Sequence, residues 1–462
     1  MYENKESFFE KLSSKRVMFC GLGRSNLPVI EMLLNYGAKI IACDSRDISK
    51  LDDSIKNLEK RGVELRLGST YMDNLDADII FRTPGMSFFN EKLQEARKHG
   101  IVVTSEMEMF FDICPCPIIA VTGSDGKTTT TTIISEILKA SKKTVHIGGN
   151  IGKPLLPIID RIRNDDIAVV ELSSFQLMSM NQSPNVAVVT NLSPNHLDIH
   201  KDMDEYINSK KNIILHQSAF DTAVLNYDNQ ITNEFSKSVR GKCMFFSRKQ
   251  KVYNGVWCDE NKIYFSKNGE NTEILSISDI KLPGKHNLEN YLAAICATLP
   301  FSDKNAITEV AKNFNGVEHR IEFTRNLNGV KYFNDSIASS PTRAISGTLS
   351  LFDGKIIMIA GGYDKKIPFD SLGPVVCSKV KCLILMGDTA DKIENAVKKS
   401  HNYDEKEIKI IHVKNMSEAV KAAHDNTVCD DVVVLCPACA SFGLYNNFEE
   451  RGNDFKNIVN SL

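Results

Sequence analysis

A short stretch rich in glycine and hydroxyl groups, VTGSDGKTTTTT (residues 121–132), has the residue types of a phosphate-binding loop. The Walker pattern G-x-x-x-x-G-K-[ST] would place its first glycine at Val121, but glycine stands instead at Gly123, three residues before Gly126. The loop follows the apolar run IIAV and precedes TTTTTIISEILKAS, which has a helical pattern. This order surrounds an anion with backbone N–H groups and a helix N-terminus, although a structural glycine turn is the alternative.

Four side chains near this loop could do phosphate and metal chemistry. The Lys127 ammonium would neutralise phosphate charge, and the Thr128 hydroxyl would reach a Mg²⁺ ion. Glu171 ends the run IAVVEL, where a carboxylate can hold the same metal, and His196 follows the next run in NLSPNHLDIH. Taken alone, Glu171 would more often be a capping or paired glutamate, and His196 a hydrogen-bonded loop residue.

The twelve cysteines are thinly spread, and most lie inside apolar runs, as reduced core thiols do. Two close pairs, Cys114/Cys116 and Cys436/Cys439, could be imagined as a four-thiolate zinc site. Because the pairs are far apart in the sequence and neither has a zinc-ribbon partner nearby, we favour reduced core residues.

Short apolar runs such as VMFC (17–20), IIAC (40–43), VAVVTN (186–191) and IIMIA (356–360) recur along the chain and alternate with helical patterns. This alternation predicts an α/β protein with parallel sheets covered on both faces. Polar or glycine-rich segments follow the runs, where this architecture places ligands. Residues 241–283 differ, because CMFFS, VYNGVWCDENKIYFS and TEILSISDIKL alternate as antiparallel strands do.

A chain of 462 residues is too long for one ordinary core and predicts about three domains. We place them at residues 1–112, 113–316 and 317–462. The fold class expected is α/β: a Rossmann-like N-terminal domain, a central P-loop ATPase-like parallel sheet with an antiparallel flank, and a Rossmann-like C-terminal domain.

The overall composition argues against several classes of protein. Hydrophobic residues make up 42% and charged residues 25%, as in a soluble globular protein. Since 56 basic residues nearly balance 58 acidic ones, we expect no nucleic acid partner. No apolar run suits a membrane span, and the charged N-terminus has no signal-peptide core, so we expect a cytoplasmic protein. Nothing demands more than a monomer.

The loop resembles the G-x-x-G-K-[ST]-[ST] motif of the Mur ligases, with Asp125 where asparagine or lysine is common. The similarity covers nearly the whole chain and includes GGNIG (148–152), TNLSPNHLD (190–198), GKHNLENYLAA (284–294), HRIE (319–322) and NDSIASSP (334–341). ELSSFQL (171–177) and PACASFGLYNNFEERGNDF (437–455) resemble the members that join D-glutamate to UDP-N-acetylmuramoyl-L-alanine. Three departures are Ile337 in place of a common lysine, Cys436 in place of serine, and RTPG in place of SPG.

The resemblance implies an ATP-dependent ligation through an acyl phosphate, in the synthesis of peptidoglycan precursors. It implies ATP, two Mg²⁺ ions and a carbamate on Lys210 as cofactors, although a Lys-Lys pair such as Lys210 and Lys211 is usually solvated. The implied catalytic residues are Lys127, His196, Lys210 and Arg320, and the implied metal site comprises Thr128, Glu171, His196 and Lys210.

The resemblance also assigns residues to the three substrates. The ATP-binding residues would be Gly123, Ser124, Asp125, Gly126, Lys127, Thr128, Thr129, Asn287, Asn290, Arg320 and Asp335. The UDP-substrate residues would be Gly21, Arg24, Ser25, Asp44, Ser45, Arg46, Thr83, Pro84, Gly85, Asn150 and His196. The D-glutamate residues would be Ser339, Lys365, Ser441 and Phe448, with Lys366 as an alternative to Lys365.

Other enzyme classes explain less of the sequence. A dehydrogenase would use only the first glycine loop, GLGRSN, which lacks the last glycine of G-x-G-x-x-G, and would leave Lys127 unexplained. A GTPase would need a guanine-binding N-K-x-D motif, and none stands in a fitting place. Another Mur-type amino-acid ligase or a folylpolyglutamate synthase remains the nearest alternative.

Overall fold

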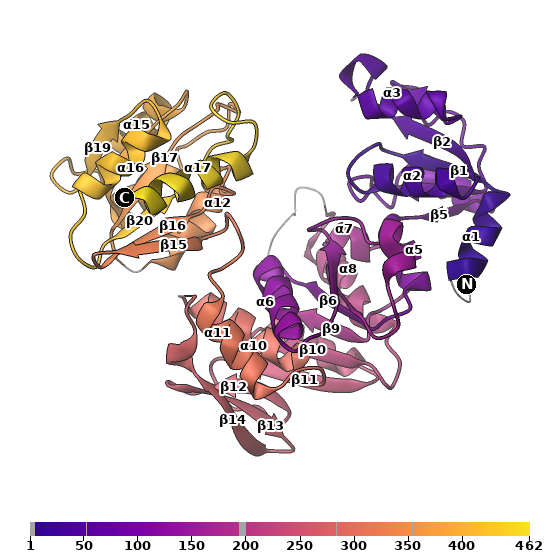
Figure 1. Ribbon diagram of the computed structural model, residues 1–462, viewed down its shortest axis with the longest axis horizontal. Helices are drawn as coiled ribbons and strands as arrows, with labels where there is room; N and C mark the ends of the chain where they lie inside the picture. The colour runs from indigo at the N-terminus through magenta and orange to yellow at the C-terminus, as the bar shows by residue number, and fades with distance from the viewer. Residues whose placement is uncertain (1–4, 52, 194–199, 283, 353) are drawn as a thin grey trace. The chain divides into compact units, whose positions relative to one another are not determined.

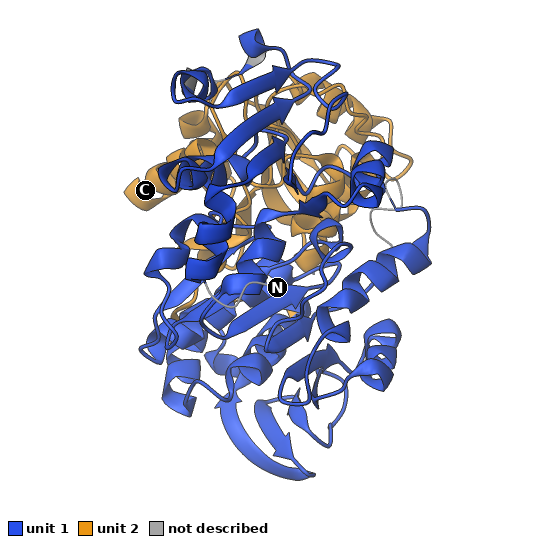
Figure 2. Ribbon diagram, turned by 90° about the vertical axis from the view of Figure 1, so that its right-hand side faces the viewer, with its two compact units in different colours: residues 1–280, 285–312 blue, residues 281–284, 313–462 orange. Residues whose placement is uncertain are grey.

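The computed structural model describes residues 5–51, 53–193, 200–282, 284–352 and 354–462. Among these residues three β-sheets are formed, each accompanied by helices (Figure 1). The chain divides into two compact units, Met1–Ile280 with Lys285–Lys312 and Lys281–Gly284 with Asn313–Leu462 (Figure 2). The first unit holds two of the sheets and the second unit holds one.

The N-terminal sheet has five parallel strands in the order β3-β2-β1-β4-β5. Its strands are β1 (Arg16–Cys20), β2 (Lys39–Asp44), β3 (Glu64–Leu67), β4 (Ile79–Arg82) and β5 (Val102–Thr104). Its helices are α1 (Lys5–Ser13), α2 (Asn26–Asn35), η1 (Ile48–Lys50), α3 (Asp53–Lys60), α4 (Glu91–Lys98) and α5 (Glu106–Ile113). The order reverses beside β1, so the segments that follow β1 and β4 emerge next to each other, at the place where such sheets bind ligands.

The middle sheet has nine strands in the order β14-β13-β12-β11-β10-β9-β6-β8-β7. Its strands are β6 (Ile118–Thr122), β7 (Val145–Gly149), β8 (Ile167–Glu171), β9 (Val186–Val189), β10 (Thr222–Asn226), β11 (Lys242–Ser247), β12 (Gly255–Cys258), β13 (Lys262–Lys267) and β14 (Glu270–Ser276). Its helices are α6 (Lys127–Ala140), η2 (Leu156–Arg161), α7 (Ser174–Leu177), α8 (Met203–Leu215), α9 (Gln230–Glu234), η3 (Phe235–Ser238), η4 (Ile277–Asp279), α10 (Lys285–Thr298) and α11 (Lys304–Asn313). The central helices α6 and α10 pack against each other (Figure 1).

One detail of the expected antiparallel flank is wrong. Strand β11, which contains CMFFS, pairs in parallel with β10 and with β12. The pairing with β10 is parallel because α9 and η3 lie between β10 and β11 and return the chain to the edge of the sheet at which β10 begins. Antiparallel pairing begins only between β12 and β13 and continues to β14.

The C-terminal sheet has six strands in the order β15-β16-β20-β17-β18-β19, antiparallel only between β15 and β16. Its strands are β15 (Glu322–Leu327), β16 (Val330–Asn334), β17 (Ile356–Ala360), β18 (Val380–Leu385), β19 (Lys409–His412) and β20 (Val432–Leu435). Its helices are α12 (Pro341–Ser346), α13 (Thr348–Leu351), α14 (Leu372–Lys379), α15 (Ala390–Lys398), α16 (Met416–Asp425) and α17 (Phe448–Ser461).

Strand β17 shows why these runs are continuously apolar. Ile356, Met358 and Ala360 belong to one hydrophobic cluster, whereas Ile357 and Ile359 belong to another. Because successive side chains of a strand point to opposite faces, alternate residues pack on the two sides of the sheet. In β17, polar residues therefore begin only after the strand ends. The candidate residue Lys365 lies in the segment that follows this carboxyl end.

Candidate nucleotide and substrate site

The glycines of the phosphate loop are required by close packing. Gly123 and Gly126 adopt φ of 148° and 77°, a conformation that favours glycine. A Cβ atom on Gly123 would lie 1.9 Å from Thr190 Oγ1, and one on Gly126 would lie 2.2 Å from Asn290 Oδ1. The shortened loop is therefore held directly against β9 and α10, with Gly126 as the N-cap of α6.

Lys127 and Thr128 begin helix α6 and face different partners. The Lys127 ammonium donates to the carbonyl oxygens of Gly123 (3.0 Å) and Ser124 (2.8 Å), which places its charge inside the loop. The Thr128 hydroxyl donates to Glu171 Oε2 at 2.6 Å, and Asn150 Nδ2 donates to Glu171 Oε1 at 2.7 Å. The fold thus gathers Asn150, Thr128 and the buried Glu171 at the carboxyl ends of β7 and β8.

Lys210 reaches the same loop from helix α8. Its side chain is buried, and Nζ donates to Thr122 Oγ1 at 3.2 Å and lies 5.0 Å from the centre of the Tyr206 ring. Burial, and to a smaller extent the Lys127 charge, lower the pKa of Lys210 to about 7, against the opposing effect of Glu171 and Asp125. Lys210 is therefore not solvated on the helix surface, as a lysine of a Lys-Lys pair usually is.

The other residues expected at the nucleotide lie around the loop. Ser124 Oγ is 2.9 Å from Tyr206 Oη, and the Asp125 N–H donates to Asn191. Asn287 and Asn290 are buried in helix α10, where Asn290 Nδ2 donates to Asn287 at 3.3 Å. Asn287 lies inside α10, two residues after its first residue, and not at the helix cap. Thr129 is buried in the first turn of α6.

The loops of the N-terminal sheet also lie together. A Cβ on Gly21 would be 2.7 Å from Thr83 Cγ2, so the GLGRSN and RTPG segments are in contact. Asp44, at the end of β2, accepts from the N–H groups of Leu22 (2.8 Å) and Arg46 (2.9 Å) and from the Arg46 guanidinium (2.9 Å). Burial raises the pKa of Asp44, but these hydrogen bonds and the Arg46 charge outweigh it and hold the pKa at about 2.

The remaining residues of this group lie in the same three loops. Arg24 and Ser25 precede helix α2, Ser45 follows β2, and Pro84 and Gly85 follow Thr83 after β4. The structure therefore places all the UDP-substrate candidates of the N-terminal sheet at the carboxyl ends of β1, β2 and β4.

Three buried residues that hold loops of the first unit were not found from the sequence. Asn26 Nδ2 donates to the Gly21 carbonyl at 2.9 Å, and Glu106 accepts from the N–H groups of Leu155 (2.8 Å) and Leu156 (2.9 Å), after the GGNIG segment. Arg82 donates to the carbonyls of Met86 (3.1 Å) and Phe175 (3.2 Å) and to the Ser179 hydroxyl. Arg82 thus joins the RTPG loop to helix α7. Its only local signal is a charge at the end of an apolar strand.

In the second unit, Arg320 lies in a turn of unusual backbone geometry. Its neighbours His319 and Ile321 have φ of 61° and 46°, and a β-branched residue with positive φ is strained. The turn is anchored by the Ile321 N–H, which donates to Asp335 Oδ1 at 3.2 Å, and by the Ile337 N–H, which donates to the His319 carbonyl at 3.1 Å. Burial raises the pKa of Asp335 to about 7, although Thr348 and Arg320 act in the opposite direction.

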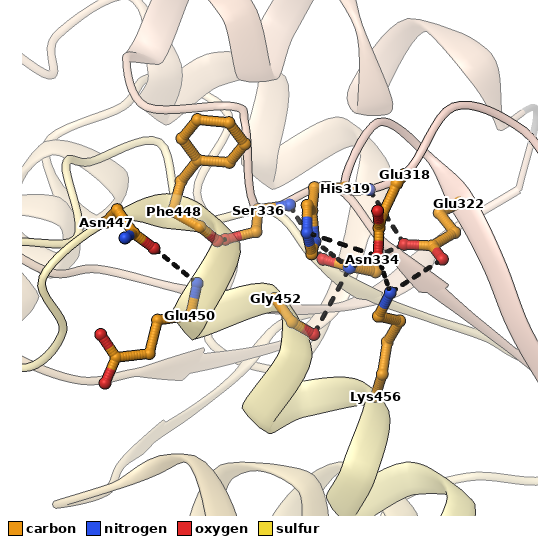
Figure 3. A network of polar contacts seen from close by, with 10 residues as sticks. All are labelled: Glu318, His319, Glu322, Asn334, Ser336, Asn447, Phe448, Glu450, Gly452 and Lys456. Atoms are coloured by element: carbon orange, nitrogen blue, oxygen red, sulfur yellow. Dashed lines mark hydrogen bonds and ion pairs between the residues drawn. The ribbon is translucent and has the colours of Figure 1, made fainter.

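A network of polar contacts connects this turn to helix α17 (Figure 3). Asn334 Nδ2 lies 3.0 Å from His319 Nδ1 and 3.0 Å from Glu322 Oε2. From α17, Lys456 Nζ pairs with Glu318 (2.7 Å) and with Glu322 (3.1 Å). A Cβ on Gly452 would lie 2.2 Å from His319 Nδ1, so α17 packs directly on the turn that carries Arg320.

Two of the residues expected to bind D-glutamate line one cavity, and the other two lie in the segment that leads into α17 and at the first residue of that helix. Ser339 and Lys365 line one small cavity together with Tyr363, Phe369 and Ala440. Ser441 is buried next to Ala440, and the Phe448 carbonyl accepts from the Ser336 hydroxyl at 2.7 Å. Lys366 is not among the residues that line this cavity, which favours Lys365 of the two lysines.

Two expectations concern residues that do not enter this geometry. His196 lies outside the described residues. In the described part of the chain all twelve cysteines are free thiols, and neither cysteine pair belongs to a cluster of three metal-ligating side chains. No helix in that part is long and apolar enough to cross a membrane.

Comparison with known families matches all three sheets. The models of the MurD-like N-terminal domain, the Mur ligase middle domain and the Mur ligase glutamate ligase domain match residues 15–105, 121–298 and 319–439. The UDP-N-acetylmuramate-alanine ligase MurC of Thermotoga maritima superposes with a TM-score of 0.57 at 19% identity, covering 97% of this chain and 99% of that one. The predicted α/β fold of three domains is confirmed.

Curated relatives match over the full length. The chain is 50% identical over 458 residues to the UDP-N-acetylmuramoylalanine--D-glutamate ligase of Acetivibrio thermocellus, with 98% of each chain covered. It is 47% identical over 463 residues to the enzyme of the same name from Clostridium botulinum strain Kyoto, with 100% of each covered. The chain belongs to the Mur ligase family, in its MurD branch.

Proposed function

We propose that this protein is an ATP-dependent ligase that joins D-glutamate to UDP-N-acetylmuramoyl-L-alanine through an acyl phosphate. The observation that carries the proposal is the convergence of Lys127, Thr128, Glu171 and Lys210 at one edge of the middle sheet. The relatives of the same length, which bear the name of this activity, support the choice of substrates. We also propose that the protein acts as a monomer in the cytoplasm, where peptidoglycan precursors are made.

The described side chains fit ATP and magnesium. Thr128 Oγ1 and Glu171 Oε2 are oxygen donors 2.6 Å apart, and Mg²⁺ prefers oxygen ligands. The loop offers N–H groups and the Lys127 ammonium to the phosphates, which suits an anion. A bound Mg²⁺ would neutralise charge on phosphate oxygens. The hydroxyl and carboxylate of these two residues would hold the metal beside the loop.

The chemistry requires positive charge because a carboxylate must attack a highly charged nucleotide. The alanyl carboxylate would attack the γ-phosphate, and the D-glutamate amine would then attack the carbonyl of the acyl phosphate and release phosphate. Preorganised cations stabilise the charge that develops in such a step. We assign this role to Lys127 and, by resemblance, to Arg320; His196 keeps its proposed place beside the muramoyl-alanine group and the metal.

The burial of Lys210 supports its proposed conversion to a carbamate. Only a neutral amine reacts with CO₂, and a pKa of about 7 makes the neutral form abundant near neutral pH. The carbamate would replace a cation by an anionic group with two oxygens, and such a group can bind the proposed second Mg²⁺. The Thr122 hydroxyl, 3.2 Å from Nζ, is placed to orient it.

The remaining proposals assign residues to each part of the three substrates. We propose that the loops after β1, β2 and β4 hold the uridine diphosphate, with Asp44 and Arg46 at the nucleoside and Gly21 and Thr83 near the diphosphate. We propose that Asn150 faces the muramoyl-alanine group. Asn287, Asn290 and Asp335 are the proposed contacts of the nucleoside of ATP. Ser339, Lys365, Ser441 and Phe448 are the proposed D-glutamate site.

The proposal is tested by measuring phosphate release with ATP, Mg²⁺, UDP-N-acetylmuramoyl-L-alanine and one amino acid at a time. We expect release with D-glutamate and only background release with L-glutamate, L-alanine or diaminopimelate. Release with a different amino acid would identify another Mur-type ligase. Release with a folate and L-glutamate would identify a folylpolyglutamate synthase, and either result would overturn the proposal.

A further inference from the structure

The segment Cys114-Pro115-Cys116 holds two thiols in contact outside the proposed catalytic site. The two sulfur atoms are 3.6 Å apart, and Cys114 Sγ is also 3.6 Å from the Cys116 carbonyl oxygen. The segment connects helix α5, which follows the N-terminal sheet, to strand β6, which leads into the phosphate loop. None of the proposed catalytic steps uses either thiol.

The backbone on both sides of the two cysteines is held by hydrogen bonds and by proline. Cys114 ends helix α5, where its N–H donates to the Phe110 carbonyl at 2.9 Å. Pro115 has a fixed φ and favours an extended conformation for the residue before it, as observed for Cys114 (φ −64°, ψ 122°). After the pair, the Pro117 carbonyl accepts from the Ala168 N–H at 3.0 Å. The contact between the sulfurs therefore does not depend on a loose loop.

The pair also has the chemistry of a reactive dithiol. Cys114 is partly exposed, whereas Cys116 is buried, so a small reagent can reach the pair at Cys114. A hydrogen bond joins the two thiols. It raises the pKa of Cys114, and burial raises it further, whereas the same hydrogen bond lowers the pKa of Cys116 although burial of Cys116 acts in the opposite direction. Transfer of the shared proton lets either sulfur carry the negative charge, and the thiolate is the nucleophile in disulfide exchange.

We propose that Cys114 and Cys116 form a thiol–disulfide exchange site that accepts a low-molecular-weight disulfide as its oxidant. One protein thiolate attacks a sulfur of the small disulfide, the S–S bond breaks, and one small thiolate leaves. The second protein thiol loses its proton and attacks the mixed disulfide, which expels the second small thiolate. The protein loses two electrons and two protons and gains one S–S bond, and the small disulfide is reduced to two thiols.

The two sulfurs are already close to bonding distance. A disulfide has an S–S length of about 2.05 Å, so side-chain rotation must bring the sulfurs together by only about 1.5 Å. The chain contains a natural contrast in Cys20 and Cys43, which face each other on the paired strands β1 and β2 but are fully buried. A second contrast is Cys429, which is exposed and is not paired with another cysteine in the described structure.

The test uses the folded full-length protein in oxidised and reduced glutathione, at ratios from reducing to oxidising. Thiols are then trapped by alkylation under denaturing conditions, and the peptides are weighed by mass spectrometry. We expect the peptide with Cys114 and Cys116 to become lighter by two hydrogen atoms and to escape alkylation. We expect Cys429 to carry glutathione. Cys20 and Cys43 should stay unoxidised in the folded protein and therefore be alkylated, and they should oxidise only in a control in which the protein is denatured before oxidation.

Two variants separate the internal disulfide from simple exposure. Cys114→Ser and Cys116→Ser each leave one thiol, so any exchange should stop at the glutathione adduct. The result that overturns the proposal is a wild-type peptide that remains a dithiol, or carries only glutathione, at the ratio at which Cys429 has fully reacted. This result requires no variant to fold, so the test holds even if a serine variant is unstable.

Discussion

Lys127 and Lys210 reach the same phosphate loop from different helices and meet different surroundings. Lys127 donates to two backbone carbonyl oxygens, whereas Lys210 is buried beside a hydroxyl and near the Lys127 charge. The first environment suits a fixed cation for phosphate. The second suits an amine that can lose its proton and react.

Lys127→Ala should abolish turnover while the protein remains folded. The side chain is only part-buried and removal of a loop charge changes stability little, but it removes stabilisation of the transferring phosphate, worth about 3 kcal/mol or more. Phosphate release measures the loss of turnover, and circular dichroism checks that the protein remains folded. The control is Lys139→Ala, on the exposed face of α6, which should keep both turnover and fold. Activity within a few-fold of wild type would exclude the phosphate-loop assignment.

The activity should depend on CO₂ and on pH through Lys210. Since the pKa of Lys210 is lowered to about 7, the amine is mostly protonated below this pH and mostly neutral above it. We therefore expect activity in CO₂-depleted buffer to fall and to return with bicarbonate, and the restored activity to decline as pH falls through about 7. Lys211→Ala, at the neighbouring position near Phe235, should keep both dependences. A fully active Lys210→Ala enzyme without bicarbonate dependence would contradict the carbamate.

Of the adjacent lysines Lys365 and Lys366, only the first should matter for D-glutamate. Loss of a charge-assisted hydrogen bond costs about 1.5–3 kcal/mol, so Lys365→Ala should raise the KM for D-glutamate roughly tenfold to a hundredfold. Lys366→Ala should leave this KM nearly unchanged. Steady-state kinetics with the other two substrates saturating measures both values, and the opposite pattern would transfer the role to Lys366.

At the scale of elements, helix α17 supports two proposed sites at once. Its first residue, Phe448, belongs to the proposed D-glutamate site, and its Gly452 and Lys456 contact the turn that carries Arg320. The strained φ values of His319 and Ile321 are held by these contacts and by Asp335. Strain of this kind persists only where the surrounding structure enforces it.

Gly452→Ala should disturb the turn through helix α17. The added methyl group would lie 2.2 Å from His319 Nδ1 and 2.9 Å from Asn334 Nδ2, so the helix or the histidine must move. We expect the free energy of unfolding to fall by about 1–3 kcal/mol and kcat to decrease with it. The control is Asn453→Ala, one residue further along α17 and exposed. Unchanged urea denaturation and kcat in Gly452→Ala would show that α17 does not position Arg320.

At the scale of the whole molecule, the candidate residues are divided between two compact units. The phosphate loop, Glu171, Lys210, Asn287, Asn290 and the N-terminal loops belong to the first unit, whereas Arg320, Asp335 and the proposed D-glutamate residues belong to the second. A ligand that binds residues of the first unit should therefore protect mainly that unit against unfolding.

ADP with Mg²⁺ should stabilise the protein through the first unit. At a ligand concentration about 100 times Kd, binding stabilises the folded state by about 2.7 kcal/mol. We expect a higher Tm in wild type, slower hydrogen exchange in α6 and the end of β8, and little effect in Lys127→Ala. Protection confined to the second unit would place the nucleotide elsewhere.

The sequence by itself determined the fold class, the family and the phosphate loop. These features are local: a continuously apolar run indicates a buried parallel strand, and the loop residues from Gly123 to Thr128 are consecutive. Their chemistry therefore depends on the strand and helix that immediately flank them. The parallel pairing of β11 was missed for the opposite reason, since strand direction depends on the crossover rather than on the residues of the strand.

Only the tertiary structure decided which side chains are buried and which distant residues touch. Lys210 is followed by another lysine and looks solvated in sequence, yet packing of α8 against the sheet buries it and shifts its pKa. The contact of Gly452 with His319 joins residues more than a hundred positions apart, and the role of Arg82 depends on helix α7. Burial and long-range contacts arise when helices and strands pack together, so a local sequence pattern cannot predict them.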